Sequence, residues 1–211
     1  MGQRSKRALR CDVCRLQSAL CLCSELSPLQ LSTRVVLVMH HREVAKTTAT
    51  GPLALRALVH GELHVHGERA ALVDLSGLHE QGRRVLLLFP SDEAKPLTQA
   101  LLAQDPRPVT LIVPDGNWRQ ASRAARRIPG MAQAERVLLS AGPPSRYRLR
   151  SEPKAGGLAT FEAIARALGV LESAAVQAQL EALFEQMVER TLRTRAEPPA
   201  LRPGIALPSL P

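Results

Sequence analysis

Four cysteines near the N-terminus have the spacing of a metal site. Cys11, Cys14, Cys21 and Cys23 follow the pattern C-x2-C-x6-C-x-C, and they are all the cysteines of the chain. Four thiolates this close in sequence can complete a tetrahedral shell around one zinc ion. Disulfides are disfavoured in the reducing cytosol, where we expect this protein to be. We therefore predict a structural zinc site with no open coordination position; the alternative is four unrelated cytosolic cysteines.

A carboxylate and the only tryptophan follow an apolar run. Asp115, Gly116 and Trp118 come just after residues 109–113, which read Val-Thr-Leu-Ile-Val. Asp115 could act as a general base or orient a substrate amine. The alternative is that Asp115 only caps the helix predicted to follow it, because Asp is common just ahead of helices.

Four arginines lie on one face of that predicted helix. Arg119, Arg123, Arg126 and Arg127 stand at positions i, i+4, i+7 and i+8. Cations on one stripe repel one another unless anions neutralise them. Because the stripe adjoins the Asp115 loop, we predict contact with phosphates; a solvated face is the alternative. The net charge of +9 favours a polyanionic partner. Aromatic residues make up only 2%, which excludes rows of stacking aromatic side chains.

Two further clusters are less specific. The Gly-rich segment before Thr160 and Glu162 leads into a predicted helix, whose first backbone amides could hold a polar ligand. His40 and His41 suggest a metal, but adjacent side chains point in different directions, so we do not expect one there. The sequence has no glycine fingerprint for nucleotides, no G-x-S-x-G motif and no cysteine left for covalent catalysis.

The elements that must position these residues alternate between strands and helices. Apolar runs predict strands over 34–39, 84–89, 109–113 and 136–140. Helices are predicted over 50–59, 92–103 (capped by Ser91), 118–127, 158–168 and 172–194, and the stretch 62–73 has only a weak pattern. Apolar strands between helices indicate an α/β fold, with a parallel-rich sheet that helices cover on both faces. Such sheets bind ligands at the carboxyl ends of their strands.

The chain of 211 residues is long enough for one well-buried domain with small appendages. We expect a zinc-binding segment at 1–30, a catalytic domain at 31–195 and a Pro-rich tail at 196–211. No run approaches the roughly 18 apolar residues of a membrane span, and we expect no secretion signal. These features predict a cytoplasmic protein with no membrane partner.

The order and spacing of the motifs resemble those of the DTW-domain family, the tRNA-uridine aminocarboxypropyltransferases. The resemblance covers roughly residues 10–190. It includes the four cysteines, H-x-R-E-x-x-K-T-T at 40–48, Phe-Pro-Ser at 89–91, Asp-Gly-Asn-Trp at 115–118, Tyr-Arg-Leu-Arg at 147–150 and Gly-Leu-Ala-Thr at 157–160. Two positions depart from the family pattern: Asn117 replaces the Thr of Asp-x-Thr-Trp, and Ala49 stands where Asn is frequent.

The resemblance implies a fold similar to the SPOUT methyltransferases, with a deep trefoil knot in the C-terminal half. It also implies tRNA as the partner and S-adenosylmethionine as the co-substrate. The implied residues for binding S-adenosylmethionine are Pro90, Ser91, Asp115, Gly116, Trp118, Leu149, Arg150, Leu158 and Thr160.

The implied reaction moves the 3-amino-3-carboxypropyl group of S-adenosylmethionine to N3 of a tRNA uridine and releases 5′-methylthioadenosine. Asp115 would take the N3 proton, and the four arginines would bind neighbouring phosphates. The target uridine must be unstacked, because N3 is otherwise buried in base pairing. The alternatives are a SPOUT-type RNA methyltransferase, which uses the same ligand, and a non-catalytic zinc-containing RNA-binding protein.

Overall fold

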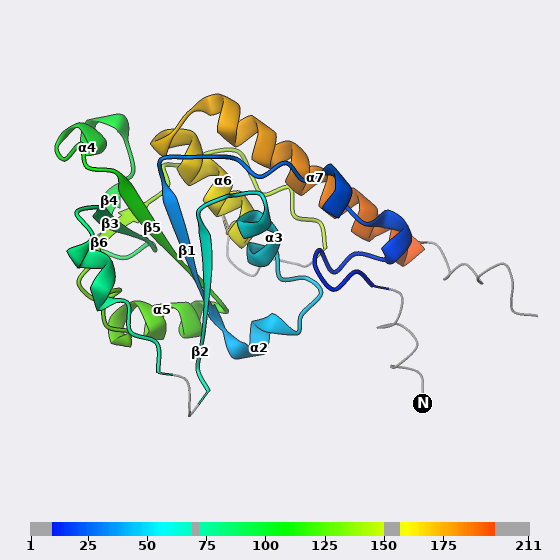
Figure 1. Ribbon diagram of the computed structural model, residues 1–211, viewed down its shortest axis with the longest axis horizontal. Helices are drawn as coiled ribbons and strands as arrows, with labels where there is room; N and C mark the ends of the chain where they lie inside the picture. The colour runs from blue at the N-terminus through cyan, green and yellow to red at the C-terminus, as the bar shows by residue number, and fades with distance from the viewer. Residues whose placement is uncertain (1–9, 69–71, 150–156, 197–211) are drawn as a thin grey trace, which may run out of the picture.

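A six-stranded sheet forms the centre of the computed structural model, which describes residues 10–68, 72–149 and 157–196 (Figure 1). The strands lie in the order β2-β1-β5-β3-β6-β4, and each pair of neighbours is parallel. Their bounds are β1 Arg34–His40, β2 Gly61–His66, β3 Arg84–Leu88, β4 Lys95–Pro96, β5 Val109–Asp115 and β6 Glu135–Leu138. The predicted parallel sheet is therefore confirmed.

Successive residues of a central strand point into two different cores. Along β1, Val35, Leu37 and Met39 belong to one core, while Val36 and Val38 belong to the other. All five side chains are fully buried. A strand covered on both faces has no polar side, which is why its sequence reads as an unbroken apolar run.

Helices cover both faces of the sheet, as predicted. The helices α3 (Gly51–Arg56), α6 (Thr160–Leu171) and α7 (Ala174–Ala196) pack on the first face, which we call the α6 face (Figure 1). The opposite face is covered by α5 (Trp118–Arg127) and the 3-10 helix η3 (Ser76–Glu80). Two short helices, α2 (His41–Val44) and α4 (Gln99–Ala103), complete the set.

Two local predictions differ from the structure. Residues 92–103 do not form one helix, because β4 intervenes and α4 begins after Thr98, whose hydroxyl accepts a hydrogen bond from the backbone N–H of Leu101 at 3.2 Å. Ser91 is therefore not the cap. Pro96 lacks an N–H and disfavours helical conformation at the residue before it, which accounts for the break. The stretch 62–73, left unassigned, contains most of the edge strand β2.

Residues 10–25, which contain the four cysteines and which we call the cysteine segment, pack on the α6 face. The segment contains the 3-10 helices η1 (Ser18–Leu20) and η2 (Cys23–Glu25), and it buries Leu16 and Leu22 in the first core. Arg190 of α7 donates to the carbonyl oxygen of Cys21 at 3.0 Å and forms an ion pair with Glu25 at 2.7 Å. The N-terminal and C-terminal parts of the described chain are thus in direct contact.

Three predictions fall on residues outside the described ranges. The tail at 196–211 lies there apart from Ala196, the last residue of α7, and so does Arg150. The trefoil knot stays a prediction, because the chain path between Leu149 and Gly157 is also outside those ranges. Within the described residues, no helix has both the length and the apolar character needed to cross a membrane.

Candidate active site and metal centre

The four cysteines converge on one point. Their sulfur atoms all lie within 4.8 Å of one another, and the Cys11–Cys23 and Cys14–Cys21 sulfur distances are 3.6 and 3.7 Å. Both distances are far longer than a disulfide bond of about 2.05 Å. They match the edge of about 3.8 Å in a tetrahedron whose Zn–S bonds are about 2.3 Å long. The cluster therefore fits a four-coordinate metal ion.

The thiols of the cluster differ in acidity. Hydrogen bonds from the backbone N–H groups of Cys14 and Val13 lower the pKa of Cys11 to about 6. Burial raises the pKa of Cys14, and it raises the pKa of Cys23 to about 12. Four thiolates in one shell need a compensating cation, and a bound metal ion supplies that charge.

Asp115 is a buried carboxylate at the carboxyl end of β5. It is 8% exposed, and the hydroxyl of Thr160, at the start of α6, donates to its Oδ1 at 2.8 Å. Asp115 does not cap α5. That role belongs to Asn117, whose Oδ1 accepts from the backbone N–H of Gln120 at 2.9 Å while the Gln120 side chain accepts from the N–H of Asn117 at 2.8 Å. The alternative that Asp115 only caps this helix is therefore wrong.

The capping geometry also explains the departure at position 117. The family pattern has Thr there, and Thr and Asn are both good N-cap residues because each offers a side-chain oxygen to the first free N–H groups. Asn117 therefore keeps the structural task of the position. The exchange leaves Asp115, two residues earlier, in the sheet.

Four motifs that are far apart in sequence meet around Asp115. Tyr147 donates its hydroxyl to the carbonyl oxygen of Thr48 at 2.6 Å, which joins the Tyr-Arg-Leu and Lys-Thr-Thr segments. The backbone N–H of Phe161 donates to Thr50 Oγ1 at 3.1 Å, which joins the start of α6 to the residues before α3. With the bond between Thr160 and Asp115, these contacts hold the motif loops together as one unit at the carboxyl end of the sheet.

A buried glutamate fixes the loop before α6. Glu162 is 3% exposed and accepts hydrogen bonds from the hydroxyl of Ser145, the N–H of Arg146 at 2.7 Å and the N–H of Ala159 at 2.9 Å. A carboxylate bound by two backbone donors and a hydroxyl satisfies groups that a buried loop would otherwise leave unpaired. Glu162 therefore ties the segment at 145–146 to the residue just before Thr160.

A histidine cluster borders the Asp115 loop, and it joins His66 to the pair His40 and His41 already noted in the sequence. His40 and His66 end the neighbouring strands β1 and β2, and their ring centroids are 5.2 Å apart; the ring of His41 lies 4.6 Å from that of His40. Burial lowers the pKa of His40 and of His66. His66 lies beside His40 because β1 and β2 pair in parallel with these two residues opposite each other. The sequence pattern around His66 is weak, so the sequence alone does not indicate this pairing.

A second feature is a cavity of about 440 Å³ next to the end of β3. Pro90, Ser91 and Trp118 line it, so three of the residues expected to bind one ligand do share one cavity. Trp118 is 52% exposed and stacks on Phe89 with ring centroids 4.9 Å apart. The hydroxyl oxygen of Ser91 is buried and has no hydrogen-bond partner within the described part of the chain.

Three other predicted ligand residues, Gly116, Leu149 and Leu158, lie within the described part of the chain. Leu149 is buried in the first core, and Leu158 is half-buried just before α6. Gly116 lies against its neighbours, since a Cβ there would be 3.1 Å from Gln120 Cβ and 3.5 Å from His40 Cβ. The close packing accounts for a glycine at this position.

The four arginines of α5 form an exposed face. Arg119, Arg123, Arg126 and Arg127 are exposed, while Ala121, Ala124 and Ala125 on the opposite side of the helix are buried against the sheet. Among the described residues no ion pair joins the four guanidinium groups to a carboxylate. Arg126 also lines the cavity of Trp118, so the basic face continues into that cavity.

Comparisons with known proteins agree with these motifs. A family model described as the DTW domain matches residues 8–192. The tRNA-uridine aminocarboxypropyltransferase 2 of Drosophila melanogaster is 30% identical over 174 residues, which cover 79% of this chain and 68% of that protein. The protein of the same name from Macaca fascicularis is 31% identical over 173 residues, and the chain spans 80% of its own length but only 58% of that relative.

One solved structure also resembles the chain. It is the SAM-dependent rRNA:acp-transferase Tsr3 from Vulcanisaeta distributa, which is 18% identical with a TM-score of 0.45; the match covers 77% of this chain and 79% of that one.

Proposed function

The chain belongs to the DTW domain family, and on this basis we propose that it is an S-adenosylmethionine-dependent tRNA-uridine aminocarboxypropyltransferase. It transfers the 3-amino-3-carboxypropyl group to N3 of a tRNA uridine. The relatives from Drosophila melanogaster and Macaca fascicularis carry this activity in their names. The observation that carries the proposal is the meeting of four family motifs around the buried carboxylate of Asp115.

The transfer needs a base at a fixed distance from an electrophilic carbon. S-adenosylmethionine supplies that carbon, the γ carbon beside the sulfonium, and 5′-methylthioadenosine leaves. Asp115 accepts the N3 proton as the N–C bond forms, and the electrons of the broken C–S bond go to sulfur. Thr160 holds one oxygen of Asp115 through its 2.8 Å hydrogen bond, so the carboxylate keeps one orientation toward the uridine.

We propose that S-adenosylmethionine binds at the carboxyl ends of β3 and β5, where open α/β sheets hold their ligands. Its binding residues are Pro90, Ser91, Asp115, Gly116, Trp118, Leu149, Arg150, Leu158 and Thr160. Two features support this choice: the buried Ser91 hydroxyl can form a hydrogen bond with a polar atom of a ligand, and Trp118 is about half exposed beside it. Because the Leu149 side chain is in the core, this residue contacts the ligand through its backbone.

The same proposal gives roles to the cysteines and the arginines. The metal is zinc, because an all-thiolate tetrahedral shell suits zinc better than the harder divalent cations. Residues 1–30 form the metal-binding segment, and residues 31–195 form the catalytic domain. Arg119, Arg123, Arg126 and Arg127 bind tRNA phosphates in the cytoplasm, and their lack of carboxylate partners among the described residues supports this role.

Mass spectrometry of the nucleosides from tRNA incubated with the protein and S-adenosylmethionine tests the proposal. We expect a uridine that has gained one aminocarboxypropyl group, together with 5′-methylthioadenosine in equal amount. A gain of one methyl group would identify a methyltransferase instead. Unmodified tRNA that nevertheless binds the protein would identify a non-catalytic RNA-binding protein.

A further inference from the structure

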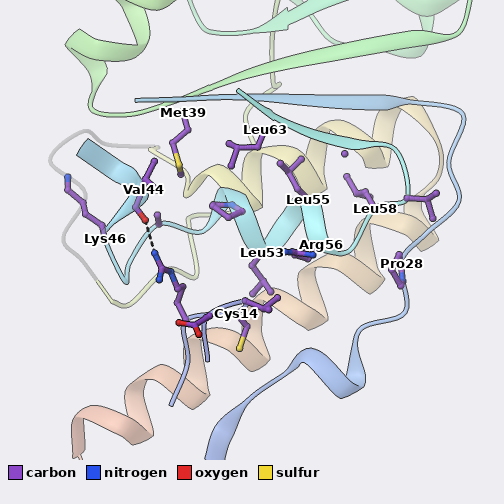
Figure 2. A pocket seen from close by; sticks show the side chains of 17 residues that line it. Cys14, Pro28, Met39, Val44, Lys46, Leu53, Leu55, Arg56, Leu58 and Leu63 are labelled. Carbon is purple, nitrogen blue, oxygen red and sulfur yellow. Dashed lines mark hydrogen bonds between the residues drawn. The ribbon is translucent and has the colours of Figure 1, made fainter. Parts of the chain in front are cut away.

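A cavity of about 750 Å³ lies between the cysteine segment and the sheet (Figure 2). Its walls come from the cysteine segment with Cys14, from β1 with Met39, from α3 with Leu53 and Leu55, and from β2 with Leu63. We call it the N-terminal cavity. Its volume is within the range of about 300–1,000 Å³ that is typical of ligand pockets.

The lining of the N-terminal cavity leaves aliphatic surface open to water. Val13, Val44, Val59 and Leu63 are 42, 39, 50 and 45% exposed. The described residues include six large hydrophobic side chains with such exposure, and four of them gather here. An exposed apolar cluster rimmed by polar groups is characteristic of a binding surface.

The rim of the cavity is basic. Arg15, Lys46 and Arg56 line it, against one carboxylate, Asp12. Lys46 forms an ion pair with the buried Glu43 at 2.7 Å, whereas the side chain of Arg56 is exposed at the end of α3. The surplus of cations favours a ligand that combines apolar and anionic parts.

Arg15 has an unusual backbone conformation, and its side chain is hydrogen-bonded to Val44, another residue that lines the cavity. Arg15 has a φ of 64°, the one positive value of a non-glycine residue within the described ranges. Its N–H donates to the carbonyl oxygen of Cys11 at 2.9 Å, and its guanidinium reaches the carbonyl oxygen of Val44 at 3.1 Å, as the dashed line in Figure 2 marks. Backbone strain of this kind persists where the surrounding structure requires it, often at binding sites.

One end of the cavity adjoins the surroundings of Asp115. Met39 lines the cavity and is the register partner of Asp115 across β1 and β5. Pro52 also lines it, and the preceding Gly51 is so close to the carboxylate that a Cβ there would be 2.9 Å from Asp115 Oδ2. A ligand in the cavity is therefore a neighbour of whatever Asp115 acts on.

We propose that the N-terminal cavity binds an unpaired nucleotide of the substrate RNA that flanks the target uridine. The base packs on the aliphatic side chains, and the phosphates approach Arg15 and Arg56. An unpaired nucleotide is required because a base inside a duplex cannot reach an apolar wall. With 2% aromatic residues, the chain must use aliphatic surface for contacts that other proteins make with aromatic rings. The inference rests on the proposed function, which makes RNA the substrate.

Two variants of the cavity test this inference, each with a matched control. Leu63→Glu is compared with Leu72→Glu, since Leu72 is 96% exposed and does not line the cavity. Arg56→Glu is compared with Arg107→Glu, since Arg107 is also exposed but does not line the cavity. Each pair changes the net charge equally. Fluorescence anisotropy then measures binding of a single-stranded oligoribonucleotide of mixed sequence and of a duplex RNA of equal length.

We expect each cavity variant to weaken single-strand binding about tenfold, the order of effect of losing one base contact. Duplex binding should change as little as in the controls. Arg56→Glu should also make the fall of log K with log salt less steep, with a slope smaller in magnitude by about 1. Both substituted side chains are substantially exposed in the wild type, and thermal unfolding within a few degrees of wild type would show that the fold is intact.

Single-strand affinity at the wild-type level in both variants would overturn the inference. An equal loss in the two controls would also overturn it, because net charge alone would then explain the effect. Product formation by the wild type separates this test from that of the proposed function. If the wild type makes no aminocarboxypropyl product but Leu63→Glu loses single-strand affinity, the proposed function fails, and only the binding of unpaired RNA at the cavity stands.

Discussion

Asp115→Asn removes the negative charge of the candidate base and keeps its shape. The amide oxygen can still accept the Thr160 hydroxyl, which is 2.8 Å from Oδ1 in the wild type. The amide nitrogen takes the place of Oδ2, and it fits because Gly51 has no Cβ to meet it. Replacing a charge-assisted hydrogen bond by a neutral one costs about 1 kcal/mol, and relief from burying a carboxylate offsets part of this cost. The free energy of unfolding should therefore change by no more than about 1 kcal/mol.

The variant cannot accept the N3 proton, so its effect on rate should be large. A lost acid–base group lowers rates by about 10²–10⁴-fold. We expect the single-turnover rate to fall at least about 100-fold, which corresponds to about 2.7 kcal/mol of transition-state stabilisation. Rapid-quench experiments with mass spectrometry of the tRNA would measure this rate, and calorimetry would measure the affinity for S-adenosylmethionine.

Three outcomes separate the possible roles of Asp115. A slow variant with normal affinity for S-adenosylmethionine and tRNA supports the base. A slow variant with weakened affinity for S-adenosylmethionine indicates that Asp115 orients the amine of that ligand instead. An unchanged rate would refute the catalytic assignment. Thr160→Ser, which keeps the hydroxyl that contacts Asp115, is the matched control and should stay near the wild-type rate.

Four further predictions follow from the metal centre, the basic face and the packing around the base. Protein purified without chelator should contain one zinc per chain by elemental analysis, and Cys14→Ser should lose the zinc and increase hydrogen exchange in the cysteine segment; zinc-free wild type would contradict this. Arg123→Glu with Arg127→Glu should lower the salt slope of tRNA binding by about 2 and leave the affinity for S-adenosylmethionine unchanged; an unaltered slope would mean a merely solvated face. Asn117→Ala should cost about 1 kcal/mol through the lost cap and lower the Tm by about 2–4 °C, whereas Asn117→Thr should unfold like the wild type. Gly51→Ala should destabilise the protein by about 1–3 kcal/mol and slow turnover, because its Cβ would lie 2.9 Å from the candidate base; wild-type stability in thermal unfolding would show that the helix shifts freely.

The strands that build the core could be predicted from the sequence, and the edge strand could not. The central strands β1, β3 and β5 are buried on both faces, so their sequences are continuous apolar runs. In contrast, β2 alternates Leu63 and Val65 with Glu62, His64 and His66, and its side chains are mostly half-buried. This alternation over 62–66 is a short strand pattern that the weak pattern of the whole stretch 62–73 obscures, and the place of β2 beside β1 is a tertiary interaction that the sequence does not contain.

The candidate site was predictable only in part. Asp115 could be located because a carboxylate after an apolar run stands at the ligand-binding edge of a parallel sheet. Its hydrogen bond to Thr160, 45 residues later, requires α6 to begin beside the end of β5. The N-terminal cavity could not be predicted at all, because its walls come from separate segments of the chain that only the fold brings together.

The contact between Arg190 and Cys21 sets an order of events during synthesis. The two residues are 169 positions apart. At the usual 5–20 residues per second, the ribosome adds Arg190 about 10–30 s after Cys21. During that interval the four thiols have been made, but the helix that covers them has not. The proposed zinc ion can therefore bind before α7 packs against the cysteine segment.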